Sequence, residues 1–316
     1  MTLPIHFEDA LAARERIRPF LPATPLRSYP ALDDEIGAGI RVLVKHENHQ
    51  PTNAFKIRNA LSALTLLSAE QRSRGVVAAT RGNHGMGVAL AGRLLGAPVT
   101  ICVPVGNNPE KNLAIRGYGA TLIEQGRDYD ETVDVAKALV RDQGLHLVHS
   151  TNDPAIIAGA ATMGLEILEE APDVDAIVVS IGGGSQAVGA LVAVSGLRPG
   201  VEVYGVQAAG APAIYEGWRA GRAITLESAA TFADGLATRS CYELTFAALR
   251  SGLRDFVVAS EAELADAVRL MLRTTHNLAE GAGAASLAGL RLLRDRLAGR
   301  KVVVILSGSN IDAETL

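Results

Sequence analysis

The stretch AIVVSIGGGSQAVGALVAV, residues 176–194, predicts a buried strand, a glycine turn and an apolar helix in direct succession. Residues 176–181 carry no charge and are mostly β-branched, which is typical of a parallel strand covered on both faces. The turn, Gly182-Gly183-Gly184-Ser185, offers backbone N–H groups and a hydroxyl at the start of the helix. Such a turn suits a phosphate, although it lacks the GxGxxG and Gly-Lys-Ser/Thr patterns of nucleotide sites. On this stretch alone, a tight turn that binds nothing stays open.

Five more apolar runs predict an α/β protein with mostly parallel strands. They alternate with Ala- and Leu-rich stretches such as GVALAGRLLG, residues 87–96, which are expected to be helices. Two of the runs end in polar turns, TRGNHG at 80–85 and SGSN at 307–310. Because ligands collect at the carboxyl ends of parallel strands, these turns and the one at 182–185 are expected to converge on one ligand. The five runs are VLV (42–44), GVVAAT (75–80), VTICVP (99–104), VYGVQ (203–207) and KVVVILSG (301–308).

The composition excludes several classes of protein. The 316 residues are 48% hydrophobic and 20% charged, with a net charge of −4, so neither a disordered chain nor a nucleic-acid-binding surface is expected. The apolar runs are too short to cross a membrane, and the amino-terminal segment lacks the apolar core of a signal peptide. Cys102 and Cys241 lie far apart, without the spacing of metal ligands. We therefore expect a cytoplasmic protein with a small-molecule partner and no metal site.

A lysine in apolar surroundings is the first candidate for chemistry. In QPTNAFKIRNALSAL, residues 50–64, Pro51 to Asn53 are expected to begin a helix, and Lys56 follows Phe55 within it. Burial would lower the pKa of this amine and make it available as a nucleophile. The alternative is a surface lysine whose aliphatic stem covers apolar neighbours.

The order of seven segments carries a family resemblance. From about residue 20 to the carboxyl terminus, the chain resembles pyridoxal phosphate (PLP) enzymes of fold type II, particularly threonine and serine dehydratases and serine racemase. Any one segment is weak, but seven in the same order make chance similarity improbable. The segments are KHENHQPTNAFKIRNA (45–60), TRGNHGMGVALAG (80–92), DPAIIAGAATMGLEIL (153–168), VVSIGGGSQAVGA (178–190), FADGLA (232–237), AEGAGAASLAGL (279–290) and SGSNID (307–312).

The resemblance implies an architecture. Fold type II enzymes are similar to the tryptophan synthase β subunit, with two open, twisted, mostly parallel α/β domains and the cofactor in the cleft between them. Transferred to this chain, a large domain would comprise residues 1–47 and 149–316, and a small mobile domain residues 48–148. Relatives are usually dimers, so a homodimer is expected.

The resemblance also implies roles for individual residues. Lys56 would be the catalytic residue and would bind PLP as a Schiff base, beside Phe55. Asn83 would contact the phenolic oxygen of PLP, Ser307 the pyridine nitrogen, and residues 182–185 the phosphate. The cofactor-binding set is Phe55, Lys56, Asn83, Gly182, Gly183, Gly184, Ser185, Gly235, Glu280 and Ser307, and the substrate-binding set is Thr80, Arg81, Gly82, Asn83 and His84.

Some positions depart from the family pattern. Arg81 stands where racemases carry a serine that moves a proton on the face of the substrate opposite the lysine, and a guanidinium cannot replace it. Arg81 would instead pair with a substrate carboxylate, or simply point to solvent. Asn53 and Ala54 replace the usual Gly-Ser. Together these changes favour a substrate other than plain serine or threonine, including the subgroup similar to hydroxyectoine-utilisation dehydratases.

The expected activity is that of an ammonia-lyase. It would eliminate water from a β-hydroxy amino acid, of the threonine or serine type or a larger, more polar analogue, and give a 2-keto acid and ammonia. A racemase, a β-replacement synthase and a non-catalytic PLP- or amino-acid-binding protein remain open alternatives. Where racemase-like members bind a divalent cation, this chain has Gln207 and Ala213, which argues against a metal. His49 and His84 are open to packing, pocket-lining or proton-transfer roles.

Overall fold

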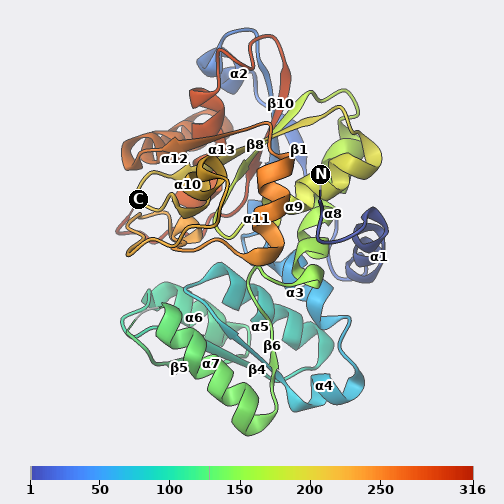
Figure 1. Ribbon diagram of the computed structural model, residues 1–316, viewed down its shortest axis with the longest axis vertical. Helices are drawn as coiled ribbons and strands as arrows, with labels where there is room; N and C mark the ends of the chain where they lie inside the picture. The colour runs from blue at the N-terminus through green and yellow to red at the C-terminus, as the bar shows by residue number, and fades with distance from the viewer. Residues whose placement is uncertain (1, 128, 316) are drawn as a thin grey trace.

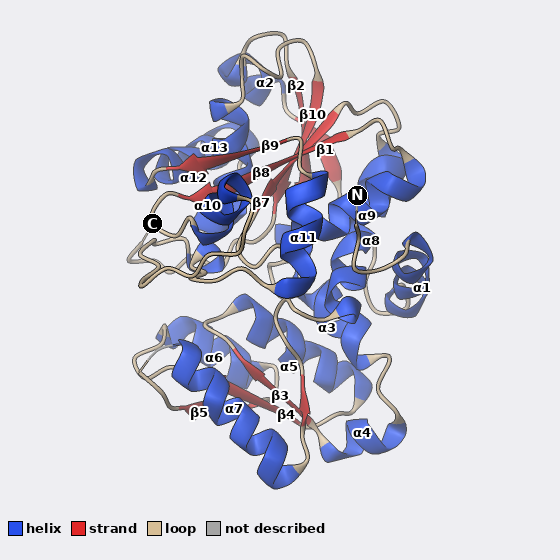
Figure 2. Ribbon diagram, viewed as in Figure 1, coloured by secondary structure: helices blue, strands red, loops and turns tan. Residues whose placement is uncertain are grey.

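The computed structural model describes residues 2–127 and 129–315, which form two twisted sheets with helices on their faces (Figure 1; Figure 2). The larger sheet has the strand order β1-β2-β10-β7-β8-β9, and only β1 runs antiparallel to its neighbour. The smaller sheet, β5-β4-β3-β6, is entirely parallel. The strands are β1 (Leu26–Ser28), β2 (Arg41–His46), β3 (Val76–Ala79), β4 (Val99–Val103), β5 (Thr121–Glu124), β6 (His146–Leu147), β7 (Ala176–Ser180), β8 (Glu202–Ala208), β9 (Asp255–Ala259) and β10 (Lys301–Leu306).

The predicted α/β class and all six predicted strands are confirmed, and the sequence analysis missed β1, β5, β6 and β9. All four missed strands lie at the edges of their sheets. An edge strand is less completely covered, so its sequence need not be a continuous apolar run. In β5, for example, no residue is fully buried.

Helices cover both faces of the larger sheet. In β7, Ile177 and Val179 pack on one side, while Ala176 and Val178 pack on the other, which explains the uninterrupted apolar sequence. The first side carries α1 (Phe7–Ile17), α8 (Pro154–Glu170), α9 (Ser185–Leu197), α10 (Ala213–Ala220) and α11 (Glu243–Gly252). The second carries α2 (Pro30–Ile36), α12 (Glu261–Thr275) and α13 (Gly281–Leu292).

The smaller sheet is covered in the same way. Helix α7 (Tyr129–Gln143) lies on one face, and α3 (Lys56–Leu64), α5 (Asn83–Leu95) and α6 (Pro109–Gly117) lie on the other. Helix α4 (Ala69–Arg74) leads into β3. Helix α3 packs against α5 and also against α8 of the larger sheet, and Figure 1 shows it at the junction of the two halves. None of the described helices is long and apolar enough to cross a membrane.

The start of α3 differs from the prediction. The helix begins at Lys56, not at Pro51–Asn53, because residues 53–55 pair with the segment that follows β10. Phe55 N–H donates to Ser307 O at 3.0 Å, and Ser309 N–H donates to Asn53 O at 2.9 Å. Asn53 has a φ of 53°, in the left-handed region that glycine and asparagine tolerate best. This conformation explains why asparagine can replace the glycine of the family pattern here.

Candidate active site

One cavity of about 600 Å³ gathers every residue that the sequence analysis proposed for cofactor or substrate. It lies where the turns after β3, β7 and β10 meet the first turn of α3. The glycine-rich turns therefore converge, as expected for the carboxyl ends of parallel strands. The predicted residues on its wall are Phe55, Lys56, Thr80, Arg81, Gly82, Asn83, His84, Gly182, Gly183, Gly184, Ser185, Gly235, Glu280 and Ser307.

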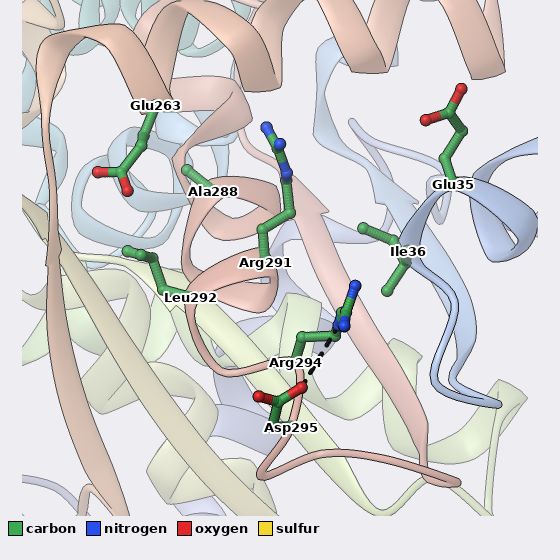
Figure 3. Close-up of a pocket in the computed structure, with 8 residues that line it drawn as sticks. All are labelled: Glu35, Ile36, Glu263, Ala288, Arg291, Leu292, Arg294 and Asp295. Carbon is green, nitrogen blue, oxygen red and sulfur yellow. Dashed lines mark hydrogen bonds and ion pairs between the residues drawn. The ribbon is translucent and has the colours of Figure 1, made fainter.

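A second hollow, of about 390 Å³, lies on the surface between α2, α12 and α13 (Figure 3). Within its wall, Arg294 and Asp295 form a 3.5 Å ion pair. The described residues that line it include no lysine that could bind an aldehyde and none of the site residues predicted from the sequence. The cavity at Lys56 is therefore the candidate active site. The hollow is lined by Glu35, Ile36, Glu263, Ala288, Arg291, Leu292, Arg294 and Asp295.

Lys56 projects from the start of α3 into the candidate active site. Its Nζ donates to Ser150 O at 3.3 Å and lies 4.8 Å from the centre of the Phe55 ring. Burial lowers the pKa of Lys56 from 10.5 to about 8. About a tenth of the molecules would therefore carry the neutral, nucleophilic amine at pH 7. The alternative of an ordinary surface lysine is wrong.

Each of the three glycines in the turn is required, two by close approach of other atoms and one by its backbone conformation. A Cβ on Gly182 would lie 2.1 Å from Gly235 O, and a Cβ on Gly183 would lie 2.3 Å from Thr151 Oγ1. Gly184 has a φ of 99°, and helix α9 begins directly after it at Ser185. Free N–H groups at the start of a 13-residue helix, without side chains over them, form a cradle suited to a phosphate.

Asn83 and Glu280 form a polar pair on the wall of the same cavity. Asn83 Nδ2 donates to Glu280 Oε1 at 2.5 Å, and Asn310 Nδ2 donates to Asn83 Oδ1 at 2.7 Å. Burial raises the pKa of Glu280 to about 7, against the opposing effects of Lys111 and Asn83. The buried carboxyl group of Glu280 thus has the hydrogen-bond partner that a buried polar group requires.

The two candidate histidines lie in different places. His84 Nε2 lies 3.0 Å from Val148 O, and its Nδ1 is buried without a partner among the described residues. Burial lowers the pKa of His84 to about 3, so the ring is neutral near pH 7 and is a poor proton donor. His49 does not line the candidate active site. It stacks on His46, with ring centres 4.8 Å apart, and its Nε2 lies 2.9 Å from Asn277 Oδ1.

Arg81 and Ser307 have few competing contacts. Arg81 is exposed at the wall of the cavity and forms no hydrogen bond or ion pair with the part of the chain that the structure describes. It is therefore free to pair with an anion. Ser307, at the end of β10, donates to Ala282 O at 3.3 Å. Its hydroxyl oxygen keeps acceptor capacity for a ligand.

Several residues on the wall were not predicted from the sequence, including Lys111, Tyr129, His149 and Tyr242. His149 follows β6, so recognising that two-residue edge strand would have pointed to it. Its Nδ1 accepts from the N–H groups of Thr151 and Asn152, at 2.9 and 2.8 Å. Lys111 lies in an ordinary amphipathic helix, and no local pattern shows that it turns inward.

The comparisons with known proteins agree with this geometry. The family model described as pyridoxal-phosphate dependent enzyme matches residues 17–308. This chain belongs to that family. The resemblance and the fold type are thereby confirmed, and the cofactor of this PLP enzyme is pyridoxal phosphate.

Relatives and solved structures match the PLP enzyme over nearly its whole length. It is 38% identical to the L-threonine ammonia-lyase of Thermotoga maritima, over 99% of this chain and 77% of that protein. It is 34% identical to an L-threo-3-hydroxyaspartate ammonia-lyase of Pseudomonas sp, over 98% and 96%. The crystal structure of a T.th. threonine deaminase matches with a TM-score of 0.91 and 35% identity, over 98% and 99%. Maize serine racemase matches with a TM-score of 0.95 and 30% identity, over 99% and 95%.

The residues present fit the cofactor of this family. A nucleophilic lysine, a glycine turn at the start of α9 and the hydroxyl of Ser307, whose oxygen can still accept a hydrogen bond, lie on one cavity. At the positions considered for a cation, Gln207 Oε1 accepts from Tyr215 N–H at 3.0 Å. The described residues contain no cluster of three or more His, Cys, Asp or Glu side chains that could hold a metal ion.

Proposed function

We propose that this PLP enzyme is an ammonia-lyase that removes water from a β-hydroxy amino acid and releases a 2-keto acid and ammonia. The observation that carries the proposal is the amine of Lys56, with its lowered pKa, on the same cavity as the cradle at 182–185 and Ser307. The threonine and hydroxyaspartate ammonia-lyases among the relatives support the same reaction class. The substrate would be of the threonine or serine type, or a larger and more polar analogue.

The cofactor would be held from several elements. Lys56 would bind its aldehyde carbon, residues 182–185 its phosphate, and Ser307 its pyridine nitrogen. Phe55 would pack beside the ring, Asn83 would contact the phenolic oxygen, and Glu280 would orient Asn83 through the 2.5 Å hydrogen bond. Gly235 has no side chain and would let the backbone pass close to the cofactor. Its carbonyl oxygen lies against Gly182 of the phosphate turn. When bound, PLP supplies the electron sink that weakens bonds at the substrate Cα.

Three residues favour elimination over racemisation. Lys56 Nζ would accept the Cα proton, and a pKa of about 8 suits a base that works near neutral pH. Racemisation needs a second group that gives a proton to the other face. Arg81 is permanently charged, and His84 is neutral with a pKa of about 3, so neither is suited to that task at neutral pH.

The substrate carboxylate would bind near the start of α5. Arg81 is exposed and unpaired within the described residues, and a guanidinium binds carboxylates with two parallel hydrogen bonds. Thr80, Gly82, Asn83 and His84 line the same wall. An arginine here suits either the α-carboxylate or a second acidic group on the substrate. Hydroxyaspartate, after which two of the relatives are named, carries such a second carboxylate.

We further propose that residues 48–148 move as a small domain against residues 1–47 and 149–316. A swinging domain would admit substrate and then exclude water.

We also propose that the protein is a homodimer in the cytoplasm. The two cysteines, Cys102 and Cys241, are unpaired, as expected in a reducing compartment. Light scattering of the purified protein tests the dimer.

A panel of β-hydroxy amino acids tests the activity. Threonine, serine and the stereoisomers of 3-hydroxyaspartate are incubated with the PLP-loaded enzyme, and keto acid and ammonia are measured. We expect both products in equal amounts without any added nucleophile, which distinguishes a lyase from a β-replacement synthase. Inversion at Cα without keto acid would instead indicate a racemase. The Lys56→Ala variant should lose the visible absorbance of bound PLP and nearly all turnover, and unchanged turnover would refute the proposal.

A further inference from the structure

A buried arginine lies two residues after Lys56 on α3. The side chain of Arg58 is 1% exposed and is bound on two sides by carboxylates. Its Nε and Nη2 donate to Glu47 Oε2 and Oε1, at 2.8 and 2.9 Å. Its Nη1 and Nη2 donate to Glu166 Oε1 and Oε2, at 2.6 and 2.8 Å. Both pairs are bidentate, so the plane of the guanidinium is fixed by four short hydrogen bonds.

The rest of this buried cluster completes the charge balance. Lys45 Nζ donates to Glu166 Oε2 at 2.6 Å and to Thr24 O at 2.7 Å. Thr24 Oγ1 donates to Glu47 Oε1 at 2.6 Å. Two positive and two negative side chains therefore share a site that is nearly closed to water, with Glu166 the most exposed at 14%. Each charge is paired, as burial requires.

The cluster joins α3 to elements around the larger sheet. Glu47 follows β2 in the short helix η1 (Glu47–His49), and Glu166 lies on α8. The α3 and α8 backbones also touch, because a Cβ on Gly159 would lie 2.5 Å from Arg58 O. Just before Lys56 in the chain, Phe55 N–H donates a hydrogen bond to Ser307 O. The first turn of α3 is thus held from both sides of Lys56.

We propose that Arg58 is a positioning residue that fixes the first turn of α3 and so sets the position of Lys56 Nζ on the wall of the cavity. This inference rests on the role of Lys56 given under Proposed function. A buried ion cluster contributes little net stability compared with apolar packing of the same volume. The cluster instead restrains the position of α3. Because the planar guanidinium of Arg58 is hydrogen-bonded to carboxylates on two sides, the helix resists rotation and sliding.

Weakening the hydrogen bonds of Arg58 should raise the pKa of Lys56. Lys56 has a pKa of about 8 because it is buried, and the titratable groups that face it are His84 on α5 and His149 after β6. Burial lowers the pKa of both rings, so both are largely neutral near pH 7. If the first turn of α3 shifts, Nζ becomes better solvated and the pKa of Lys56 rises toward its ordinary 10.5.

The experiment compares Arg58→Lys with Lys45→Met. The first variant keeps the charge of the cluster but loses the two-sided fork, whereas the second loses a charge but leaves Arg58 and both its carboxylates in place. In the cofactor-free protein, Lys56 is labelled with acetic anhydride over a pH series and quantified by peptide mass spectrometry. The binding of PLP, followed by visible absorbance, and kcat and KM are measured on the same preparations.

We expect Arg58→Lys to raise the pH of half-labelling of Lys56 by about one unit and to lower kcat about 10- to 100-fold. Lys45→Met should lower thermal stability but leave the labelling midpoint as in the wild type. If Arg58→Lys does not fold, Glu47→Gln weakens the same fork from one side and should shift the midpoint in the same direction. Wild-type midpoints in both Arg58→Lys and Glu47→Gln, with normal PLP affinity, would overturn the proposal.

The labelling midpoint also separates this inference from the proposed function. A wild-type enzyme that releases no keto acid from any amino acid of the panel would contradict the ammonia-lyase reaction. The same protein would still support the positioning role if Arg58→Lys, but not Lys45→Met, shifts the midpoint of Lys56.

Discussion

Lys111 and Asp234 meet at the wall of the candidate active site, where Lys111 Nζ lies 2.5 Å from Asp234 Oδ2. Lys111 lies on α6 beside the smaller sheet, and Asp234 begins the short helix η2 (Asp234–Leu236) beside the larger one. A second contact lies on the same side, where Asn108 Nδ2 donates to Asp312 Oδ2 at 2.9 Å. Lys111 passes directly over Gly82, since a Cβ there would lie 2.8 Å from Lys111 Cδ. These contacts link the two halves of the molecule across the cavity.

Breaking this ion pair should affect substrate binding more than stability. We expect Asp234→Asn to raise KM several-fold, because the proposed closure of the small domain over the cavity would lose a contact between the two halves. The loss in unfolding free energy should stay below about 1 kcal/mol, because Asp234 is 40% exposed and the solvent screens the pair. Steady-state kinetics and urea unfolding measure both effects. Asp266→Asn, which breaks an exposed pair with Arg269 on α12, is the control and should change neither.

Removing the guanidinium at position 81 should reduce catalysis selectively. For the true substrate, we expect Arg81→Ser to lower kcat/KM by an amount equivalent to about 2 to 4 kcal/mol, the value of a lost charged hydrogen-bond pair. Arg81→Lys keeps the charge and should lose less. The two variants are assayed on the panel of β-hydroxy amino acids. Equal activity of Arg81→Ser and the wild type would remove Arg81 from the substrate site.

The buried carboxyl of Glu280 should make stability depend on pH. Its pKa is about 7 in the folded protein and 4.5 ordinarily, so the folded state holds a proton that the unfolded chain releases between these values. The free energy of unfolding therefore falls as pH rises from 4.5 to 7. Glu280→Gln cannot titrate, so the cofactor-free variant should match the wild type near pH 4 and exceed its stability at pH 8 by up to roughly 3 kcal/mol. Urea unfolding at both pH values checks this, and a constant difference between the two proteins would contradict it.

The left-handed conformation of Asn53 should decide which substitutions it accepts. Alanine at a φ of 53° is disfavoured by about 1 kcal/mol, so Asn53→Ala should lower the free energy of unfolding by that amount. Asn53→Gly restores the residue of the family pattern and should lie within a few tenths of a kcal/mol of the wild type. Urea denaturation measures both variants. An alanine variant as stable as the glycine variant would show that this conformation carries no strain.

The sequence predicted those parts of the fold that are encoded by short stretches. Strand β7 could be predicted because Ile177 and Val178 face opposite covered sides, which leaves a continuous apolar run. Strand β6, His146–Leu147, could not, because two half-buried residues at a sheet edge carry no pattern. Missing it concealed His149 on the wall of the candidate site. Asn53 was recognised as a departure from the family, but its reason, a positive φ, is a property of the folded backbone.

The α/β class, the family and the residues around Lys56 and the turn at 182–185 could be predicted without a structure, because they depend on motifs of a few neighbouring residues. The contact of Lys111 with Asp234, 123 residues away, and the pairing of Arg58 with both Glu47 and Glu166 became visible only in the folded chain. The pKa of Lys56 likewise depends on burial by chain segments far from it in sequence. Such contacts arise when separate elements pack together, and no local pattern of side chains encodes them.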